Sequence, residues 1–229
     1  MVEITLGNKV LTSPKTQVRR MSMVIWGPSG AGKTTLAATA PGPILWVNFD
    51  PDGTSSLGDR EDILIADFTS FNEMSLKHGI TEVKGASMEM PTLQGYGRRN
   101  SYTMQGVMSF IKATGAFNKH CIVIAHEDAP QKDDLTGAMM VSILVGGKMQ
   151  SEIPIKLSEV WHLLDTGKDR KITVRSSRLR KPMKSRMFKM DESSDFNWSY
   201  DAESWEGEGI KEWYDAWVAN EGRKIPLPK

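Results

Sequence analysis

The chain has 229 residues, of which 39% are apolar and 25% charged, and this composition excludes a mainly disordered, collagen-like or coiled-coil protein. Its 29 Lys and Arg residues are balanced by 28 Asp and Glu residues, which excludes a simple polycation that binds nucleic acid through bulk charge. The single cysteine, Cys121, rules out an intrachain disulfide and favours a reducing compartment. No run reaches the roughly 20 apolar residues of a membrane span. We therefore expect a soluble, cytoplasmic protein without a membrane partner.

Apolar runs that alternate with helical patterns predict an α/β fold. Residues 33–40 are expected to form a helix that Pro-Gly ends, and residues 101–114 carry apolar side chains at the i, i+3, i+4 and i+7 positions of one helix face. Strands separated by helices favour a mainly parallel, twisted sheet with helices on both faces. The predicted strands are residues 21–26, 44–49, 63–66 and 121–125, with weaker candidates at 160–164 and 171–175 on either side of a Thr-Gly-Lys-Asp turn.

Composition shifts suggest how the chain is organised. We assign residues 1–190 to one core, in which the polar stretch 78–100 is expected to be a loop or insertion, and residues 191–229 to an acidic C-terminal extension. Residues 168–189 hold ten basic side chains against one acid, whereas residues 191–212 hold eight acids against one base. The extension should contain an amphipathic helix at about residues 208–220 whose apolar face docks on the core. Packing of that face on a neighbouring subunit is the alternative.

One segment carries a specific phosphate-binding motif. Residues 27–34 read GPSGAGKT and match G-x-x-x-x-G-K-[ST] in full, between a predicted strand and a predicted helix. Glycines let the backbone wrap closely and point successive N–H groups at an anion. Lys33 would reach the β- and γ-phosphates of ATP, and the Thr34 hydroxyl would bind Mg²⁺. The residues expected to cradle the nucleotide are Gly27, Pro28, Ser29, Gly30, Ala31, Gly32, Lys33 and Thr34.

Polar residues follow three of the predicted strands. Asp67 comes directly after residues 63–66 and is the candidate magnesium acid, because ligands bind at the carboxyl ends of strands in open α/β sheets. Asp52 is the candidate base that orients the attacking water, with Asp50 as its competitor. His126 follows the strand 121–125 and is a candidate sensor of the γ-phosphate. The alternatives are turn or capping roles for the aspartates and a half-buried histidine with a backbone partner.

Five segments, in this order, resemble the phage RecA-like ATPases, also called phage nucleotide-binding or AAA-domain proteins. The segments are GPSGAGKTTLA, ILWVNFDPDG, ILIADFTSF, CIVIAHED and RLRKPMKSR, and they span about residues 20–189. The resemblance implies a RecA-like strand order, extends the nucleotide loop to Thr35 and gives Asp67 the second magnesium motif. Phe68 follows Asp67, whereas terminase-like and AAA+ motors usually carry an acidic pair there.

The resemblance also implies roles for positions outside the loop. Asp52 falls where RecA-like proteins usually carry a catalytic glutamate, which is one methylene longer, and His126 falls at the γ-phosphate sensor position. The segment 127–147 falls where the family has a mobile DNA-contacting loop. Lys184 and Arg186 are the candidates for a cation that reaches the γ-phosphate on the neighbouring subunit of a ring or filament.

Together these features predict a Mg²⁺-dependent ATPase that hydrolyses ATP to ADP and phosphate. We expect it to act as a homo-oligomer on DNA, most readily single-stranded, in recombination or annealing, with the basic residues of 168–189 neutralising backbone phosphates. A second basic and aromatic patch lies at residues 96–102. The alternatives are a nucleotide-binding component of a phage DNA-packaging or other assembly, and a small-molecule kinase with a lid formed by residues 78–100.

Overall fold

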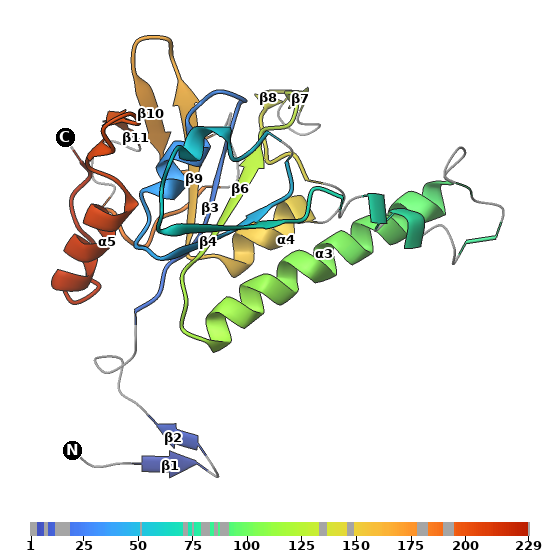
Figure 1. Cartoon of the computed structure of the whole chain (residues 1–229), viewed down its shortest axis with the longest axis horizontal. Coiled ribbons are helices and arrows are strands. Elements are labelled where there is room, and N and C mark those ends of the chain that lie inside the picture. The colour runs from blue at the N-terminus through green and yellow to red at the C-terminus, as the bar shows by residue number, and fades with distance from the viewer. Residues whose placement is uncertain are drawn as a thin grey trace.

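The structure of the chain is a computed structural model, shown in Figure 1. It describes residues 4–6, 9–11, 19–50, 52–70, 73–74, 76–78, 83–84, 87, 92–132, 137–145, 149–177, 183–189 and 195–228.

A five-stranded sheet forms the centre of the molecule, and the strand that leads into the phosphate-binding motif lies inside it. β3 pairs in parallel with β6 on one side and β9 on the other, whereas β9, β10 and β11 are antiparallel neighbours. A tight turn joins β9 to β10, closed by the Thr166 N–H that donates to the Asp169 carbonyl at 2.9 Å. In spatial order the strands are β11 (Asp195–Trp198), β10 (Arg170–Thr173), β9 (Glu159–Asp165), β3 (Ser22–Gly27) and β6 (Cys121–His126).

The remaining described strands form two-stranded sheets. The α/β prediction is confirmed, but the two parallel strands that follow the motif along the chain, β4 and β5, pair with each other outside the five-stranded sheet. Their apolar side chains are more exposed than those of β3, whose six residues are all buried. The pairs are β1 (Ile4–Leu6) with β2 (Lys9–Leu11), β4 (Ile44–Asn48) with β5 (Ile63–Asp67), β7 (Gln131–Lys132) with β8 (Met139–Met140), and β12 (Tyr200–Asp201) with β13 (Glu206–Gly207); η1 (Ser55–Leu57) is a short 3-10 turn.

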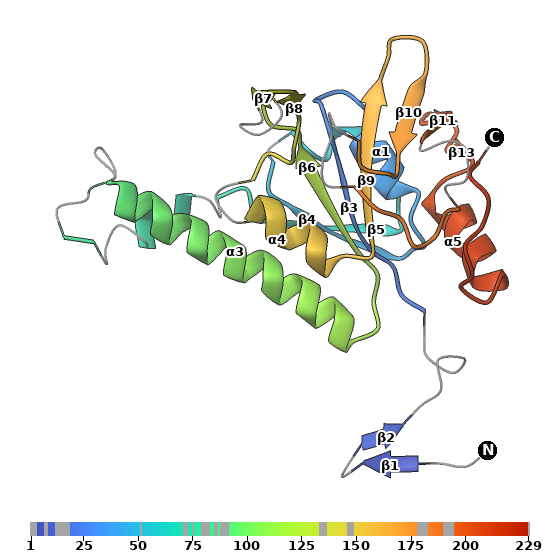
Figure 2. The same cartoon turned by 180° about the vertical axis from the view of Figure 1, so that it is seen from behind.

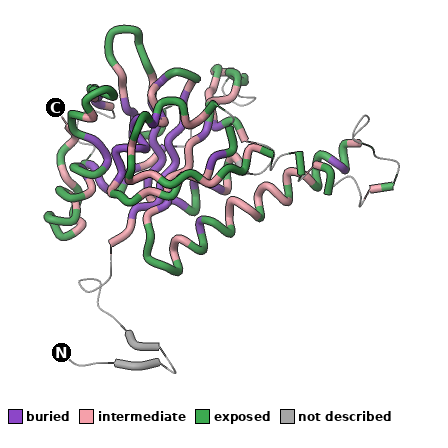
Figure 3. The backbone as a smooth tube through the Cα atoms, viewed as in Figure 1, coloured by how far each residue is buried: buried purple, intermediate pink, exposed green. Residues whose placement is uncertain are grey.

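Helices cover both faces of the five-stranded sheet, as Figures 1 and 2 show. α1 (Lys33–Ala38) and α5 (Ile210–Ala219) pack against one set of β3 side chains, which includes Met23 and Ile25. α3 (Leu93–Ala116) and α4 (Met149–Lys156) pack against the alternate set, Val24 and Trp26. Successive side chains of a strand point to opposite faces, so the continuous apolar run of β3 fills two cores at once. Figure 3 shows this buried centre in the strands.

Helix α3 begins earlier than its apolar stripe predicts. The stretch 78–100 was expected to be a loop or insertion, yet α3 already starts at Leu93, and the Thr92 hydroxyl caps it by accepting the Gly95 N–H at 3.2 Å. The side chain of Leu93 is 91% exposed, so no apolar periodicity marks this first part of the helix. Most of residues 79–91 lies outside the described part of the chain.

The C-terminal helix docks on the core, as its apolar face predicts. Ile210 and Trp213 are buried, while Tyr214 and Trp217 pack against the same cluster. Trp213 contacts the rings of Trp161 and Phe188, with 5.9 Å between ring centroids in each pair. The acidic extension is therefore part of the same packed unit as the sheet.

Candidate nucleotide site

The phosphate-binding motif forms a tight loop between a buried strand and a short helix. β3 ends at Gly27, and α1 begins at Lys33. Gly27, Gly30 and Gly32 have φ angles of 154°, 77° and 89°, which residues with a side chain rarely adopt. A Cβ atom on Gly27 would also collide with the Leu163 carbonyl on β9. The glycines of the motif are thus needed both for the backbone path and for a close strand contact.

The remaining positions of the motif span the loop and the first turn of α1. Gly32 precedes the first helical residue and accepts the Leu36 N–H at 2.9 Å. Loop N–H groups at the start of a helix bind anions because they lack partners within the helix. Ser29 and Gly30 are exposed, Pro28, Gly32 and Thr34 are half-buried, and Gly27, Ala31, Lys33 and Thr35 are buried.

Lys33 is buried beneath the loop. Its ammonium donates to the carbonyl oxygens of Gly27 at 3.0 Å and Pro28 at 2.6 Å. Burial lowers the pKa of Lys33, and the negative charge of Glu127 opposes that shift. The ammonium is therefore held at the loop by backbone acceptors and lies within the electrostatic reach of one carboxylate.

That carboxylate, Glu127, was not singled out by the sequence. It follows β6, and its N–H donates to the Gly27 carbonyl at 3.0 Å, which fixes it beside the loop. Its Oε2 lies 3.0 Å from Nε2 of His162, a fully buried residue of β9. His162 pairs with Trp26 across the strands, and the two rings meet edge to face at 4.4 Å. β6 and β9 thus bring Glu127 and His162 together around the end of the motif strand.

His126 and Glu127 differ in where they lie, although they are neighbours in sequence. His126 pairs with Gly27 in the β3–β6 register, so it is at the predicted end of the sheet, and its side chain is exposed. Strand alternation sends consecutive side chains to opposite sides. The position of His126 next to the loop strand is as predicted, and its role as a γ-phosphate sensor stays a prediction.

The three predicted aspartates are exposed: Asp50 and Asp52 lie in the turn after β4, and Asp67 is the last residue of β5. Oδ1 of Asp50 accepts the Asp52 N–H at 3.2 Å, and Oδ1 of Asp67 accepts the Thr69 N–H at 2.9 Å. These are the local turn contacts named above as the alternative. Asp67 ends β5, as predicted, but β5 is not part of the sheet that holds the loop. The side-chain hydrogen bonds of Asp50 and Asp67 are local, whereas the backbone of Glu127 is bonded to Gly27 of the loop.

The chemistry of Thr34 and Asp67 fits a magnesium ion. A hydroxyl and a carboxylate are hard oxygen donors, and Mg²⁺ is usually held by one or two such groups together with substrate phosphates and water. The described residues contain no cluster of three or more His, Cys, Asp or Glu side chains able to hold a metal alone. Any divalent cation at this loop would therefore depend on phosphate oxygens for part of its shell.

Lys184 and Arg186, the predicted trans-acting cations, lie away from the phosphate loop of the same chain. The backbone of Lys184 bridges to Val160, with N–O distances of 2.8 and 3.0 Å. Val160 is opposite Val24, three positions before Gly27 in β3. The Arg186 side chain is exposed. Residues 178–182 of the basic block, and Gly146 and Gly147 of the predicted DNA loop, lie outside the described residues.

A buried carboxylate anchors the segment that carries Arg186. Glu159 accepts the Trp161 indole N–H at 2.9 Å and the backbone N–H groups of Arg186 and Met187 at 2.8 and 3.1 Å. Burial raises the pKa of Glu159, although these hydrogen bonds favour the charged form. The backbone at Arg186 is therefore fixed to β9, while its side chain projects outward.

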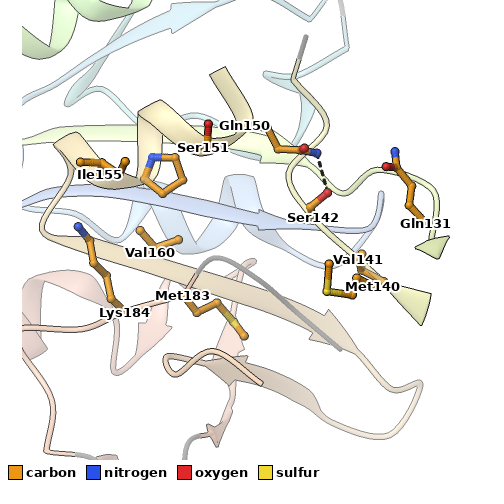
Figure 4. Close-up of a pocket in the computed structure, with 11 residues that line it drawn as sticks. Gln131, Met140, Val141, Ser142, Gln150, Ser151, Ile155, Val160, Met183 and Lys184 are labelled. Carbon is orange, nitrogen blue, oxygen red and sulfur yellow. Dashed lines mark hydrogen bonds between the residues drawn. The ribbon is translucent and has the colours of Figure 1, made fainter. Parts of the chain in front are cut away.

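A cavity of about 460 Å³ lies beside Lys184 and is separate from the phosphate loop. Figure 4 shows Lys184 and Val160 on one wall and Ile155 of α4 near them, while Gln150 donates to the Ser142 hydroxyl at 2.6 Å. Burial and the nearby Arg186 charge lower the pKa of Lys184. No residue of the motif lines this cavity.

Comparison with known protein families gives a match that covers the motif. Residues 19–78 match the family model of an AAA domain, a stretch that runs from the start of β3 through α1, β4 and β5. No curated protein matches the chain. Within the described chain, no helix has the length and apolar character needed to cross a bilayer. The AAA-domain match and the loop geometry together support a nucleotide-binding, ATPase-like protein of the P-loop NTPase type.

Proposed function

We propose that this protein binds ATP with Mg²⁺ and hydrolyses it to ADP and phosphate. The observation that carries the proposal is the complete phosphate loop, in which three positive-φ glycines surround a buried lysine that donates to loop carbonyls. The AAA-domain match over residues 19–78 supports the same activity. Nucleotide phosphates would replace the Gly27 and Pro28 carbonyls as acceptors for the Lys33 ammonium.

The residues around the loop suggest how hydrolysis proceeds. A water molecule forms a bond to the γ-phosphorus as the bond to the oxygen of the leaving ADP breaks, and Lys33 stabilises the charge on the phosphates. Thr34 and Asp67 would hold Mg²⁺, which supplies charge neutralisation between the phosphate groups. We propose Glu127 as the group that orients the water, because its backbone and the Lys33 ammonium both bond to the Gly27 carbonyl. Asp50 and Asp52 instead lie exposed in the turn after β4.

We further propose that the protein works on DNA, most readily single-stranded, as a homo-oligomer in phage recombination or annealing. The resemblance of the five sequence segments to phage RecA-like ATPases supports this assignment. The Arg186 side chain is exposed on a backbone that Glu159 anchors, which suits a cation that acts on the neighbouring subunit. Lys184 is its competitor for that role. The DNA-packaging component and the small-molecule kinase are the rival functions. ATP binding without any turnover, even with DNA present, would favour the former, and the assay below tests for the latter.

The test measures phosphate release from ATP by the whole chain, with and without single-stranded DNA. The Lys33→Ala variant should lose turnover by at least roughly 100-fold, because the ammonium stabilises charge that develops in the transition state. Lys119→Ala removes an exposed lysine outside the site and is the matched control. Stimulation by DNA supports the proposed role, and a requirement for a small phosphate acceptor supports a kinase. Unchanged turnover in Lys33→Ala would refute the assignment.

A further inference from the structure

Arg170 lies directly against the phosphate loop, although it is 137 positions from Lys33 along the chain. It begins β10, and a Cβ atom placed on Gly32 would lie 3.3 Å from both Cζ and Nε of the Arg170 guanidinium. Gly32 is the last glycine of the motif and the residue that precedes α1. The absence of a side chain at Gly32 therefore gives the guanidinium its close approach to the loop backbone.

Two neighbouring strands hold Arg170 at this place. The β-sheet register sets it opposite Asp165 on β9 and Trp198 on β11. Its guanidinium carbon lies 5.7 Å from the centre of the Trp198 ring, and its Nε lies 3.8 Å from Oδ2 of Asp165. An aromatic face within about 6 Å attracts a guanidinium. Arg170 is thus oriented by the sheet and by stacking, before any ligand binds.

The guanidinium retains hydrogen-bonding capacity for a ligand. Its ion pair with Asp165 is longer than a hydrogen bond, and the other oxygen of Asp165 already accepts the Gly167 N–H at 2.7 Å. The side chain of Arg170 is 34% exposed, so it is reachable from solvent. An arginine has five N–H donors in a planar fork whose geometry matches phosphate oxygens.

We propose that Arg170 binds the phosphate chain of the nucleotide within its own subunit. This inference rests on the proposed function, since it supplies a second cation to the loop that holds Lys33. It differs from the role given to Lys184 and Arg186, which would act across a subunit boundary. The ligand class is a nucleoside di- or triphosphate, and Trp198 and Asp165 are positioning residues that orient the guanidinium.

The experiment measures the affinity of the whole chain for ATP and ADP by calorimetry in the absence of DNA. Arg170→Ala should weaken binding about 10- to 100-fold, the range expected for loss of a hydrogen-bonded charged contact. Arg170→Lys should lose less, because it keeps the charge without the fork. Arg223→Ala is the matched control, since Arg223 is exposed and pairs only locally with Glu221 among the described residues. It should bind like the unaltered protein.

The salt dependence of nucleotide binding separates loss of a direct contact with the phosphates from a general disturbance of the fold. Binding by Arg170→Ala should depend less on ionic strength, because salt screens the interaction that the variant lacks. If Arg170→Ala does not fold, Arg170→Gln gives the same reading with the side-chain length nearly kept. The role of Arg170 would be overturned if folded Arg170→Ala and Arg170→Gln bound ATP with normal affinity, or if their binding kept its salt dependence. In that case Lys33→Ala should still lose binding, so the proposed function would stand. Failure of the unaltered protein to bind either nucleotide would overturn the proposed function and this inference together.

Discussion

Gly27 combines two constraints at one residue, a positive φ and contact with the neighbouring strand. Its φ of 154° is unfavourable for a residue with a side chain, and the space where a Cβ would lie holds the Leu163 carbonyl. The motif predicts this glycine from its role in phosphate binding. The contact with Leu163 adds a reason that depends on β9, which lies more than 130 positions later in the sequence.

Gly27→Ala should therefore destabilise the protein even without nucleotide. We expect the free energy of unfolding to fall by about 3 kcal/mol or more, from backbone strain and overpacking combined. Gly167→Ala is the control, since Gly167 has a φ of 81° but no atom within 4 Å of the added Cβ, and it should cost only about 1 kcal/mol. Urea unfolding checks both values, and equal costs would contradict the packing argument.

Glu127 is the residue at which the sequence was least informative. Its contact with His162 depends on β6 and β9 flanking the same strand, and no local spacing reports that arrangement. A polar residue near the end of a predicted strand was the available signal, but the same signal applied to His126 and Asp67. By contrast, the burial of Lys33 and the positive φ values of Gly30 and Gly32 follow from the motif itself.

Glu127→Gln tests the proposed water-orienting role. We expect steady-state ATP turnover to fall at least roughly tenfold, because the amide cannot accept a proton, while ATP affinity changes by less than about threefold. Glu203→Gln alters an exposed carboxylate far along the chain and serves as the control. If Glu127→Gln kept full turnover while Asp52→Asn or Asp50→Asn lost it, the water-orienting role would pass to the turn after β4.

Among the elements, periodic apolar patterns were the most reliable guide. The apolar side chains of α5 pack into the core on one face of the sheet. Those at the i, i+3, i+4 and i+7 positions of α3 pack into the core on the other face. The exposed first turns of α3 lack such a stripe, so its start at Leu93 depends on the Thr92 cap rather than on burial. Strand β11 was not predicted at all, because Asp195–Trp198 is a short segment of mixed polarity inside the acidic extension.

Trp213 tests the packing of α5 at the scale of the element. Trp213→Ala should lower the free energy of unfolding by about 3–5 kcal/mol, since it removes a large buried ring from an aromatic cluster. Val218, on the same helix, is 38% exposed, and Val218→Ala should cost less than about 1 kcal/mol. Denaturant titration followed by circular dichroism distinguishes the two. A small loss for Trp213→Ala would mean that α5 adds little to the fold.

At the scale of the whole molecule, the sequence predicted the α/β class and helices on both sheet faces. It did not predict that β4 and β5 pair outside the five-stranded sheet. Hydrophobic runs report burial, but they carry no information about which strand becomes a neighbour. The order β11-β10-β9-β3-β6 depends on contacts between segments far apart in the chain, such as β3 with β9.

The proposed oligomer leads to a test on mixed subunits. Arg186→Ala should bind ATP normally but hydrolyse it at least roughly 100-fold more slowly, as expected for loss of a cation that acts in trans. Mixed with Lys33→Ala, it should regain measurable turnover, because some interfaces would combine an intact loop with an intact arginine. Activity is measured across mixing ratios, and the absence of rescue at every ratio would contradict a trans role.

Cys121 begins β6 next to the motif strand, and it is the chain's single thiol. Burial raises the pKa of this thiol, so in the closed sheet it should react slowly with alkylating reagents. Its N–H also donates to the Met21 carbonyl at 3.0 Å, so separation of β6 from the segment that leads into β3 should speed its labelling. The rate at which Cys121 is alkylated, followed by mass spectrometry, would therefore report local opening of the sheet beside the site.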